Sequence, residues 1–312
     1  MREFVRAVLI LAISVLPLQA RAEKAVSLSA TEKVRLWEGT IVHSKEVTLE
    51  TFLPEQGKSG VGVIICPGGS YCWHDYETEG RRVAKWLNDN GIAAFLLKYR
   101  VLGKYQFAMF TRLFFPGHQH PDMISDLQRA IQYVRENSER FGIRTLGAMG
   151  FSAGGHLVMC AAEFADTDFP ALSGISSSQS RRLDFVAPIY PVVTMKPPYV
   201  HKRSRRALLG EYRIHSKALQ DSLSLEDHVP ANCPPVFLVN CTDDPVVKYQ
   251  NSVLLDSALT VRGVNHKYIR YENGGHGFGA SDTKGSELAR GWKKEFLLWL
   301  EEELKVLEKS QY

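Results

Sequence analysis

The chain has 312 residues, of which 45% are hydrophobic and 23% charged, a composition that suits one large globular α/β domain. Its formal net charge is only +4 at pH 7, which argues against a nucleic-acid-binding protein. Residues 201–206 form one basic cluster, which we expect to be a solvated segment entering a helix. Because the sequence shows no internal repeat and no Pro-, Gly- or Ser-rich linker, it predicts a single domain over residues 23–312.

Residues 1–22 have the pattern of a secretory signal peptide. Arg2 and Arg6 precede an apolar run, residues 7–16, that is too short to span a bilayer, and residues 20–22 form a small-x-small cleavage signal. We therefore expect export to the periplasm, the cell surface or the medium, with no membrane attachment after cleavage. An uncleaved anchor is the less favoured alternative, and the sequence does not indicate an oligomeric state.

After residue 45, short apolar runs typical of strands alternate with longer stretches typical of helices. Strands are predicted at residues 46–52, 61–66, 92–97, 144–149, 184–190, 235–240 and 267–271. Helices are predicted at residues 81–90, 122–141, 157–162, 246–262 and 287–307. This alternation predicts an α/β fold whose central sheet is mostly parallel, with helices on both faces.

A G-x-S-x-G pattern, Gly150-Phe151-Ser152-Ala153-Gly154, lies between a predicted strand and a predicted helix. Such a strand–Ser–helix context is typical of a nucleophile elbow, in which a tight turn exposes the serine hydroxyl at a helix N-terminus. The motif also occurs by chance as an ordinary glycine-rich turn. Ser152 is therefore a candidate nucleophile whose role depends on a base and an acid elsewhere in the chain.

A second glycine-rich turn, Cys66-Pro67-Gly68-Gly69-Ser70, follows the buried strand at residues 61–66. We expect the amides of Gly69 or Ser70, together with that of Ala153, to form an oxyanion hole. An ordinary turn is the alternative for this segment.

An acid and a base are predicted at the ends of the last two strands. Asp244 precedes Pro245 and is the favoured acid, while Asp243 is the alternative and would otherwise cap the turn. His276, which lies between glycines in residues 273–279, is the predicted base. The order Ser, Asp, His is the one that nucleophile-elbow hydrolases use.

Together these motifs resemble those of α/β-hydrolase-fold serine esterases, in the acetyl esterase, acetylxylan esterase and BD-feruloyl-esterase-like group. The resemblance covers roughly residues 45–305 and includes residues 67–69, 121–130, 150–156, 243–247, 250–252 and 274–278. It implies removal of acetyl groups from xylan or related plant glycans by a Ser–His–Asp triad and an acyl-enzyme, with no metal or organic cofactor. The resemblance also implies that Asp126 braces loops by hydrogen bonds and takes no part in catalysis.

Two departures from the family pattern bear on the predicted substrate more than on the predicted catalytic chemistry. Ser70 replaces the usual third glycine, and residues 101–120 form a long aromatic insertion that suits a lid, a pocket wall or a packed surface segment. Tyr71 and Trp73 are expected near the mouth of the site, where an aromatic ring suits a sugar, although core packing is as plausible for Trp73.

Other functions stay open from the sequence alone. A feruloyl or aryl esterase, or a lipase, would use the same triad. A prolyl-oligopeptidase-type peptidase and a catalytically inactive binding module are less favoured alternatives. The five cysteines have no metal-ligand spacing, and their pairing cannot be predicted from the sequence.

Overall fold

The structure is a computed structural model that describes residues 25–42, 44–103, 114 and 116–309. The predicted signal peptide, residues 1–22, lies outside the described residues, as do residues 104–113 and 115 of the predicted insertion. Over the described ranges, no helix combines the length and apolar character needed to cross a bilayer.

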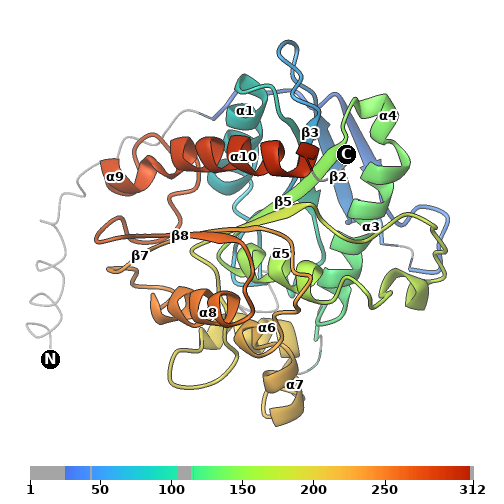
Figure 1. The fold of residues 1–312 in the computed structure, drawn as a ribbon. Coiled ribbons are helices and arrows are strands. Elements are labelled where there is room, and N and C mark those ends of the chain that lie inside the picture. The colour runs from blue at the N-terminus through green and yellow to red at the C-terminus, as the bar shows by residue number, and fades with distance from the viewer. Residues whose placement is uncertain (1–24, 43, 104–113, 115, 310–312) are drawn as a thin grey trace, which may run out of the picture.

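The described strands form one eight-stranded sheet in the order β1-β2-β4-β3-β5-β6-β7-β8 (Figure 1). Their bounds are β1 Glu32–Arg35, β2 Thr48–Phe52, β3 Val61–Cys66, β4 Ala93–Lys98, β5 Thr145–Phe151, β6 Phe185–Ile189, β7 Val236–Cys241 and β8 His266–Tyr271. β1 and β2 pair antiparallel with their neighbours, and all other neighbouring strands are parallel. The predicted mostly parallel sheet is confirmed.

Helices cover both faces of this sheet (Figure 1). Their bounds are α1 Arg82–Asp89, α3 Asp122–Glu136, α4 Ser138–Phe141, α5 Ala153–Glu163, α6 Lys202–Leu209, α7 Lys217–Ser222, α8 Gln250–Val261, α9 Glu287–Arg290 and α10 Trp292–Lys309. A π-helical turn, η1 Glu77–Arg81, precedes α1, and the 3₁₀ turns are η3 Pro170–Ser173 and η4 Leu225–Asp227.

The core has two layers, one on each face of the sheet. Side chains of α3, α5 and α8 pack in one layer, and side chains of α1 and α10 pack in the other. On β3, Ile64 points into the first layer, whereas Val63 and Ile65 point into the second, as the alternation of a strand requires. β3 is a continuous apolar run because both of its faces are buried.

Several predicted boundaries were wrong, each for a local reason. β1 was not predicted because its four residues are half-buried or exposed and carry an edge-strand pattern. The helix predicted at 122–141 is interrupted at Asn137, whose backbone is not helical. The helix predicted from residue 246 begins at Gln250, because Asp244 accepts hydrogen bonds from the backbone amides of residues 246 and 247. The basic cluster leads into α6, as expected of a segment that enters a helix, whereas α7, which also lies between β6 and β7, was not predicted.

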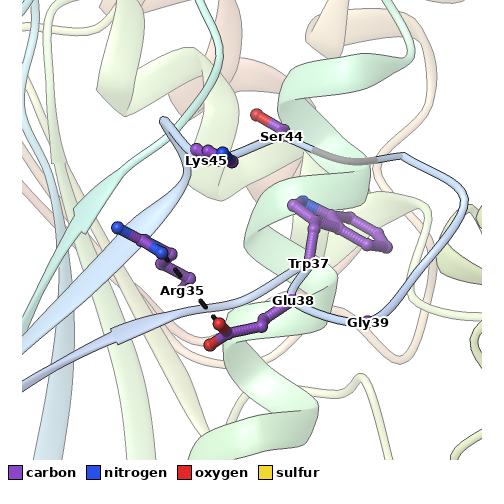
Figure 2. A pocket seen from close by; sticks show the side chains of 6 residues that line it. All are labelled: Arg35, Trp37, Glu38, Gly39, Ser44 and Lys45. Atoms are coloured by element: carbon purple, nitrogen blue, oxygen red, sulfur yellow. Dashed lines mark ion pairs between the residues drawn. The ribbon is translucent and has the colours of Figure 1, made fainter.

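Asp126 on α3 braces the segments after β1 and β4. It is fully buried and accepts hydrogen bonds from the Trp37 indole at 2.6 Å and from the Arg100 amide at 2.7 Å. Beside Trp37, a small hollow opens in the β1–β2 connection (Figure 2). Figure 2 also shows the ion pair of Arg35 and Glu38 across this hollow, which no candidate catalytic side chain lines.

Candidate active site

Ser152 lies in a strained turn between β5 and α5. Its backbone has φ +54° and ψ −117°, a conformation that is uncommon for a residue with a side chain. A Cβ on Gly150 would lie 2.0 Å from the carbonyl oxygen of Gly154, and a Cβ on Gly154 would lie 2.0 Å from that of Cys66. The two glycines are therefore needed for the turn to pass this close to its neighbours.

Ser152, His276 and Asp244 form a continuous chain of hydrogen bonds. The Ser152 hydroxyl lies 2.9 Å from His276 Nε2, and His276 Nδ1 lies 2.6 Å from Asp244 Oδ2. These contacts suit a neutral imidazole whose Nδ1–H donates to the carboxylate while Nε2 accepts from the serine. The Asp244 side chain is 1% exposed and that of His276 is 11% exposed, so water has little access to the chain. This arrangement can transfer the serine proton to histidine.

The two neighbouring aspartates have separate partners. Asp243 accepts hydrogen bonds from the amides of Gly274 at 3.2 Å and Gly275 at 2.9 Å, and so holds the loop that carries His276. The second oxygen of Asp244 accepts from two amides of its own turn, which fixes the carboxylate orientation. The structure thus brings Asp244 against the histidine and Asp243 against its loop.

The predicted oxyanion loop lies beside the serine. A Cβ on Gly68 would lie 2.9 Å from Ser152 Cβ, so the loop backbone packs directly on the nucleophile. Gly69 has φ +134° and Ser70 has φ +58°. In the described part of the chain, the amides of Gly69, Ser70 and Ala153 donate to no protein acceptor. These amides can therefore donate to a ligand oxygen.

The two predicted substrate-binding aromatics are differently placed. Tyr71 is fully buried, and its hydroxyl bonds His156 Nδ1 at 2.8 Å, so the expectation that it lies at the mouth of the site was wrong. Its side chain turns into the core beneath the loop. Trp73 is half-buried, packs against the core, and is covered by the Arg203 guanidinium 5.1 Å from its ring.

Arg203 belongs to the basic cluster, which was predicted to be solvated. Its Nε instead donates to the Ser70 hydroxyl at 3.0 Å, so α6 reaches the oxyanion loop. Nearby, burial and the Arg203 charge lower the pKa of His201 to about 4. His201 is consequently neutral at physiological pH, and its Nδ1 lies 2.7 Å from the Ser204 hydroxyl. The sequence alone gave no signal that this cluster would meet the loop.

Tyr190 is a site residue that sequence reasoning missed. It follows β6 with φ +39°, and its ring centroid lies 4.7 Å from that of His276. Its hydroxyl accepts a hydrogen bond from the Gly279 amide at 2.8 Å. The local signal was a tyrosine at the end of the strand predicted at residues 184–190, which is also an ordinary core position.

Metal-binding groups and cysteines add nothing to the site. In residues 25–42, 44–103, 114 and 116–309, no three or more His, Cys, Asp or Glu side chains cluster to hold a metal ion. Cys66, Cys72, Cys160 and Cys241 are buried, and Cys233 is half-buried. The predicted burial of Cys66, Cys160 and Cys241 is confirmed.

The strand–Ser–helix turn, the hydrogen-bonded triad geometry and the mostly parallel sheet define the class of α/β-hydrolase esterases. Residues 49–259 match the model of the BD-FAE family, and the chain belongs to this family of carboxylic-ester hydrolases. The acetyl ester-xyloside bifunctional hydrolase from Caldicellulosiruptor lactoaceticus is similar in structure, with a TM-score of 0.73 and 30% sequence identity. That match covers 88% of this chain and 97% of the other, and the predicted α/β-hydrolase fold is confirmed.

Curated relatives share part of their length with this chain. An acetylxylan esterase of Xylanibacter ruminicola is 28% identical over 232 residues, which is 73% of this chain and 43% of the relative. Endo-1,4-beta-xylanase B of Butyrivibrio fibrisolvens is 31% identical over 235 residues, which is 74% of this chain and 34% of the relative. The chain thus spans less than half the length of these relatives.

Proposed function

We propose that this protein is a serine esterase that removes acetyl groups from xylan or related plant glycans. The observation that carries the chemistry is the chain of hydrogen bonds from Ser152 through His276 to Asp244, beside a loop with free amides. The substrate class is supported by the relatives named as an acetylxylan esterase and an acetyl ester-xyloside hydrolase.

In the proposed reaction, His276 Nε2 accepts the hydroxyl proton while Ser152 Oγ attacks the ester carbonyl carbon. The amide of Ala153 and those of Gly69 or Ser70 donate to the oxygen of the tetrahedral intermediate. The intermediate collapses as the sugar alcohol leaves with the proton from Nε2, and an acetyl-serine remains. Water, deprotonated by the same imidazole, attacks this ester and releases acetate and the serine hydroxyl. Side chains and amides supply every group, so the scheme needs no cofactor.

The substrate test is acetate release from acetylated xylan, measured beside hydrolysis of p-nitrophenyl acetate, butyrate and octanoate and of methyl ferulate. We expect acetate from the polymer or its oligomers, and activity that falls sharply beyond the acetyl chain length. Hydrolysis of long or aromatic esters without acetate release would contradict the acetyl assignment. That result would favour a lipase or feruloyl esterase that uses the same triad.

The nucleophile is tested with Ser152→Ala. We expect turnover to fall by at least about 10⁴-fold while the unfolding temperature stays close to that of wild type. A fluorophosphonate probe should label wild type and not the variant. A folded Ser152→Ala protein with substantial esterase activity would contradict the mechanism.

We also propose that the protein is exported after cleavage of residues 1–22. The support is the basic start, the short apolar run and the Ala-Arg-Ala signal in this segment. N-terminal sequencing of protein recovered from the expressing cells should begin at Glu23. Recovery of only the uncleaved chain would contradict the proposal.

A further inference from the structure

A buried carboxylate that the triad does not use lies next to the nucleophile. Glu79 comes from η1, a π-helical turn of a kind often found at functional sites, and is 3% exposed. The position that a Cβ on Gly68 would occupy is 2.7 Å from Glu79 Oε2 and 2.9 Å from Ser152 Cβ. The carboxylate and the serine therefore flank the same glycine.

Each oxygen of this carboxylate holds a different part of the site. Oε2 accepts a hydrogen bond from the Gly68 amide at 2.7 Å, and Oε1 accepts one from the Tyr190 hydroxyl at 2.9 Å. Gly68 begins the oxyanion loop, so the first contact fixes the start of the segment whose next amides are the proposed oxyanion donors. Hydrogen bonds to an ionised acceptor are shorter and stronger than those between neutral groups.

Tyr190 carries the connection to the histidine loop. Its hydroxyl donates to Glu79 and accepts from the Gly279 amide, while its ring packs 4.7 Å from the imidazole of His276. A chain of three hydrogen bonds thus joins the oxyanion loop at Gly68 to the histidine loop at Gly279. The two loops are more than 200 residues apart in the sequence.

We propose that Glu79 is a positioning residue for ester hydrolysis. It sets the relative placement of the oxyanion loop and of His276, and its negative charge stabilises the imidazolium that forms when His276 takes the Ser152 proton. This inference rests on the proposed triad mechanism and assigns to that site a fourth ionisable group.

The charge state of Glu79 depends on the groups that face it, which are Asp75, Tyr99, Tyr190 and His276. Burial raises the pKa of Glu79 to about 7, and the Asp75 carboxylate adds to this effect. His276 and the hydrogen bonds from the Tyr190 hydroxyl and the Gly68 amide oppose the rise. An ionised carboxylate can accept both of these bonds, whereas a protonated one must use one oxygen as a donor. We therefore expect protonation of Glu79 to contribute to the loss of activity on acidification.

Glu79→Gln separates charge from geometry. Its amide oxygen can accept from Gly68, and its NH₂ can donate to the Tyr190 oxygen, so the Tyr190 contact is kept with its direction reversed while the charge is lost. We expect kcat for p-nitrophenyl acetate to fall by about five- to tenfold with little change in KM. The acid limb of kcat/KM, measured from about pH 5 to about pH 9, should move to lower pH, because the group that titrates near neutrality is gone.

Glu79→Ala removes both contacts, and Tyr190→Phe removes the anchor of Gly279. We expect kcat to fall by about 100-fold in the first variant and by about tenfold in the second, since small misplacements of reacting groups are costly. The matched control is Glu50→Gln. Glu50 is another buried carboxylate, on β2, and is bound to Lys33 and Arg81. This control should keep the wild-type kcat and pH profile.

Rates of fluorophosphonate labelling should follow the same order, and thermal unfolding should show that each variant is folded. The inference is overturned if folded Glu79→Gln keeps kcat within about twofold of wild type and an unchanged acid limb. That result would overturn it even if Glu79→Ala failed to fold, because the residue would then be structural only. A wild-type protein that is inactive on every ester and unlabelled by the probe would instead contradict the proposed function itself.

Discussion

At the scale of single residues, two adjacent aspartates have different tasks because their carboxylates point to different partners. Asp244 bonds the imidazole of His276, whereas Asp243 bonds the amides of the loop that carries it. Asp244→Asn should lower kcat by about 10³–10⁴-fold, because an amide favours the wrong histidine tautomer. Asp243→Asn keeps an oxygen that can accept a hydrogen bond from the loop, and it should lower kcat by no more than about tenfold. Steady-state kinetics on p-nitrophenyl acetate would contradict this division if Asp243→Asn were the more damaging change.

His156 gives a second prediction at this scale, on stability against pH. It is fully buried, its Nδ1 lies 2.8 Å from the Tyr71 hydroxyl, and its Nε2 lies 2.9 Å from the Leu223 carbonyl oxygen. Burial lowers the pKa of His156 to about 4. Below about pH 6.5 the unfolded chain protonates this histidine while the folded chain does not, so its contribution to stability is lost as the pH falls towards 4.

We therefore expect His156→Gln to be less stable than wild type at pH 7 but less sensitive to acid. Between about pH 6.5 and pH 4, its free energy of unfolding should fall less steeply than that of wild type, by up to about 1.4 kcal/mol per pH unit. Urea unfolding of both proteins across this range measures the difference, in which the contributions of other titrating groups cancel. Parallel curves would show that the pKa of His156 is not lowered in the folded state, and would contradict this prediction.

At the scale of elements, the β5–α5 turn depends on close backbone contacts. A Cβ on Gly150 would lie 2.0 Å from a backbone oxygen that cannot move away. Gly150→Ala should therefore lower the free energy of unfolding by at least about 3 kcal/mol and remove nearly all esterase activity. Gly142 is the control: it ends α4 with φ +66° and has open space around it. Gly142→Ala should lower the free energy of unfolding by about 1–2 kcal/mol and leave kcat unchanged. Equal losses in the two variants would contradict the steric argument.

The elements also show what the sequence could and could not predict. Ser152, Asp244 and His276, which the structure brings into hydrogen-bond contact, could be singled out as candidates because glycine spacing and chain order are local signals of strand ends in this fold. Glu79 was missed because a charge in an amphipathic stretch usually faces solvent, and only the packing of η1 under the loop buries it. Tyr71 was misplaced because adjacent residues in a turn can point to opposite sides.

Local sequence patterns also explain why the basic cluster at residues 201–206 was wrongly predicted to be solvated. Its basic residues predicted a solvated surface, since local sequence carries no information on what a long connection will meet. The structure instead brings Arg203 against Ser70, a residue 133 positions earlier in the chain. Such contacts are set by the crossover from β6 to β7, so they can be read only from the folded chain.

At the scale of the whole molecule, the oxyanion loop is therefore held from outside its own strand by α6. Arg203 donates to the Ser70 hydroxyl and covers Trp73, which limits the freedom of the loop at the amides that we propose as oxyanion donors. Arg203→Ala should lower kcat by about tenfold, because a looser loop stabilises the tetrahedral oxygen less well.

Arg206 provides the matched control for this test. It lies on the same helix, its side chain is 44% exposed, and it pairs with Glu211. Arg206→Ala should therefore change kcat by less than about twofold, since exposed ion pairs contribute little. Arg203→Lys should recover only part of the loss, because an ammonium group cannot make the same planar contact over an indole. Equal kcat values in Arg203→Ala and Arg206→Ala would mean that β3 and the contacts beneath the loop suffice, and that α6 does not contribute to catalysis.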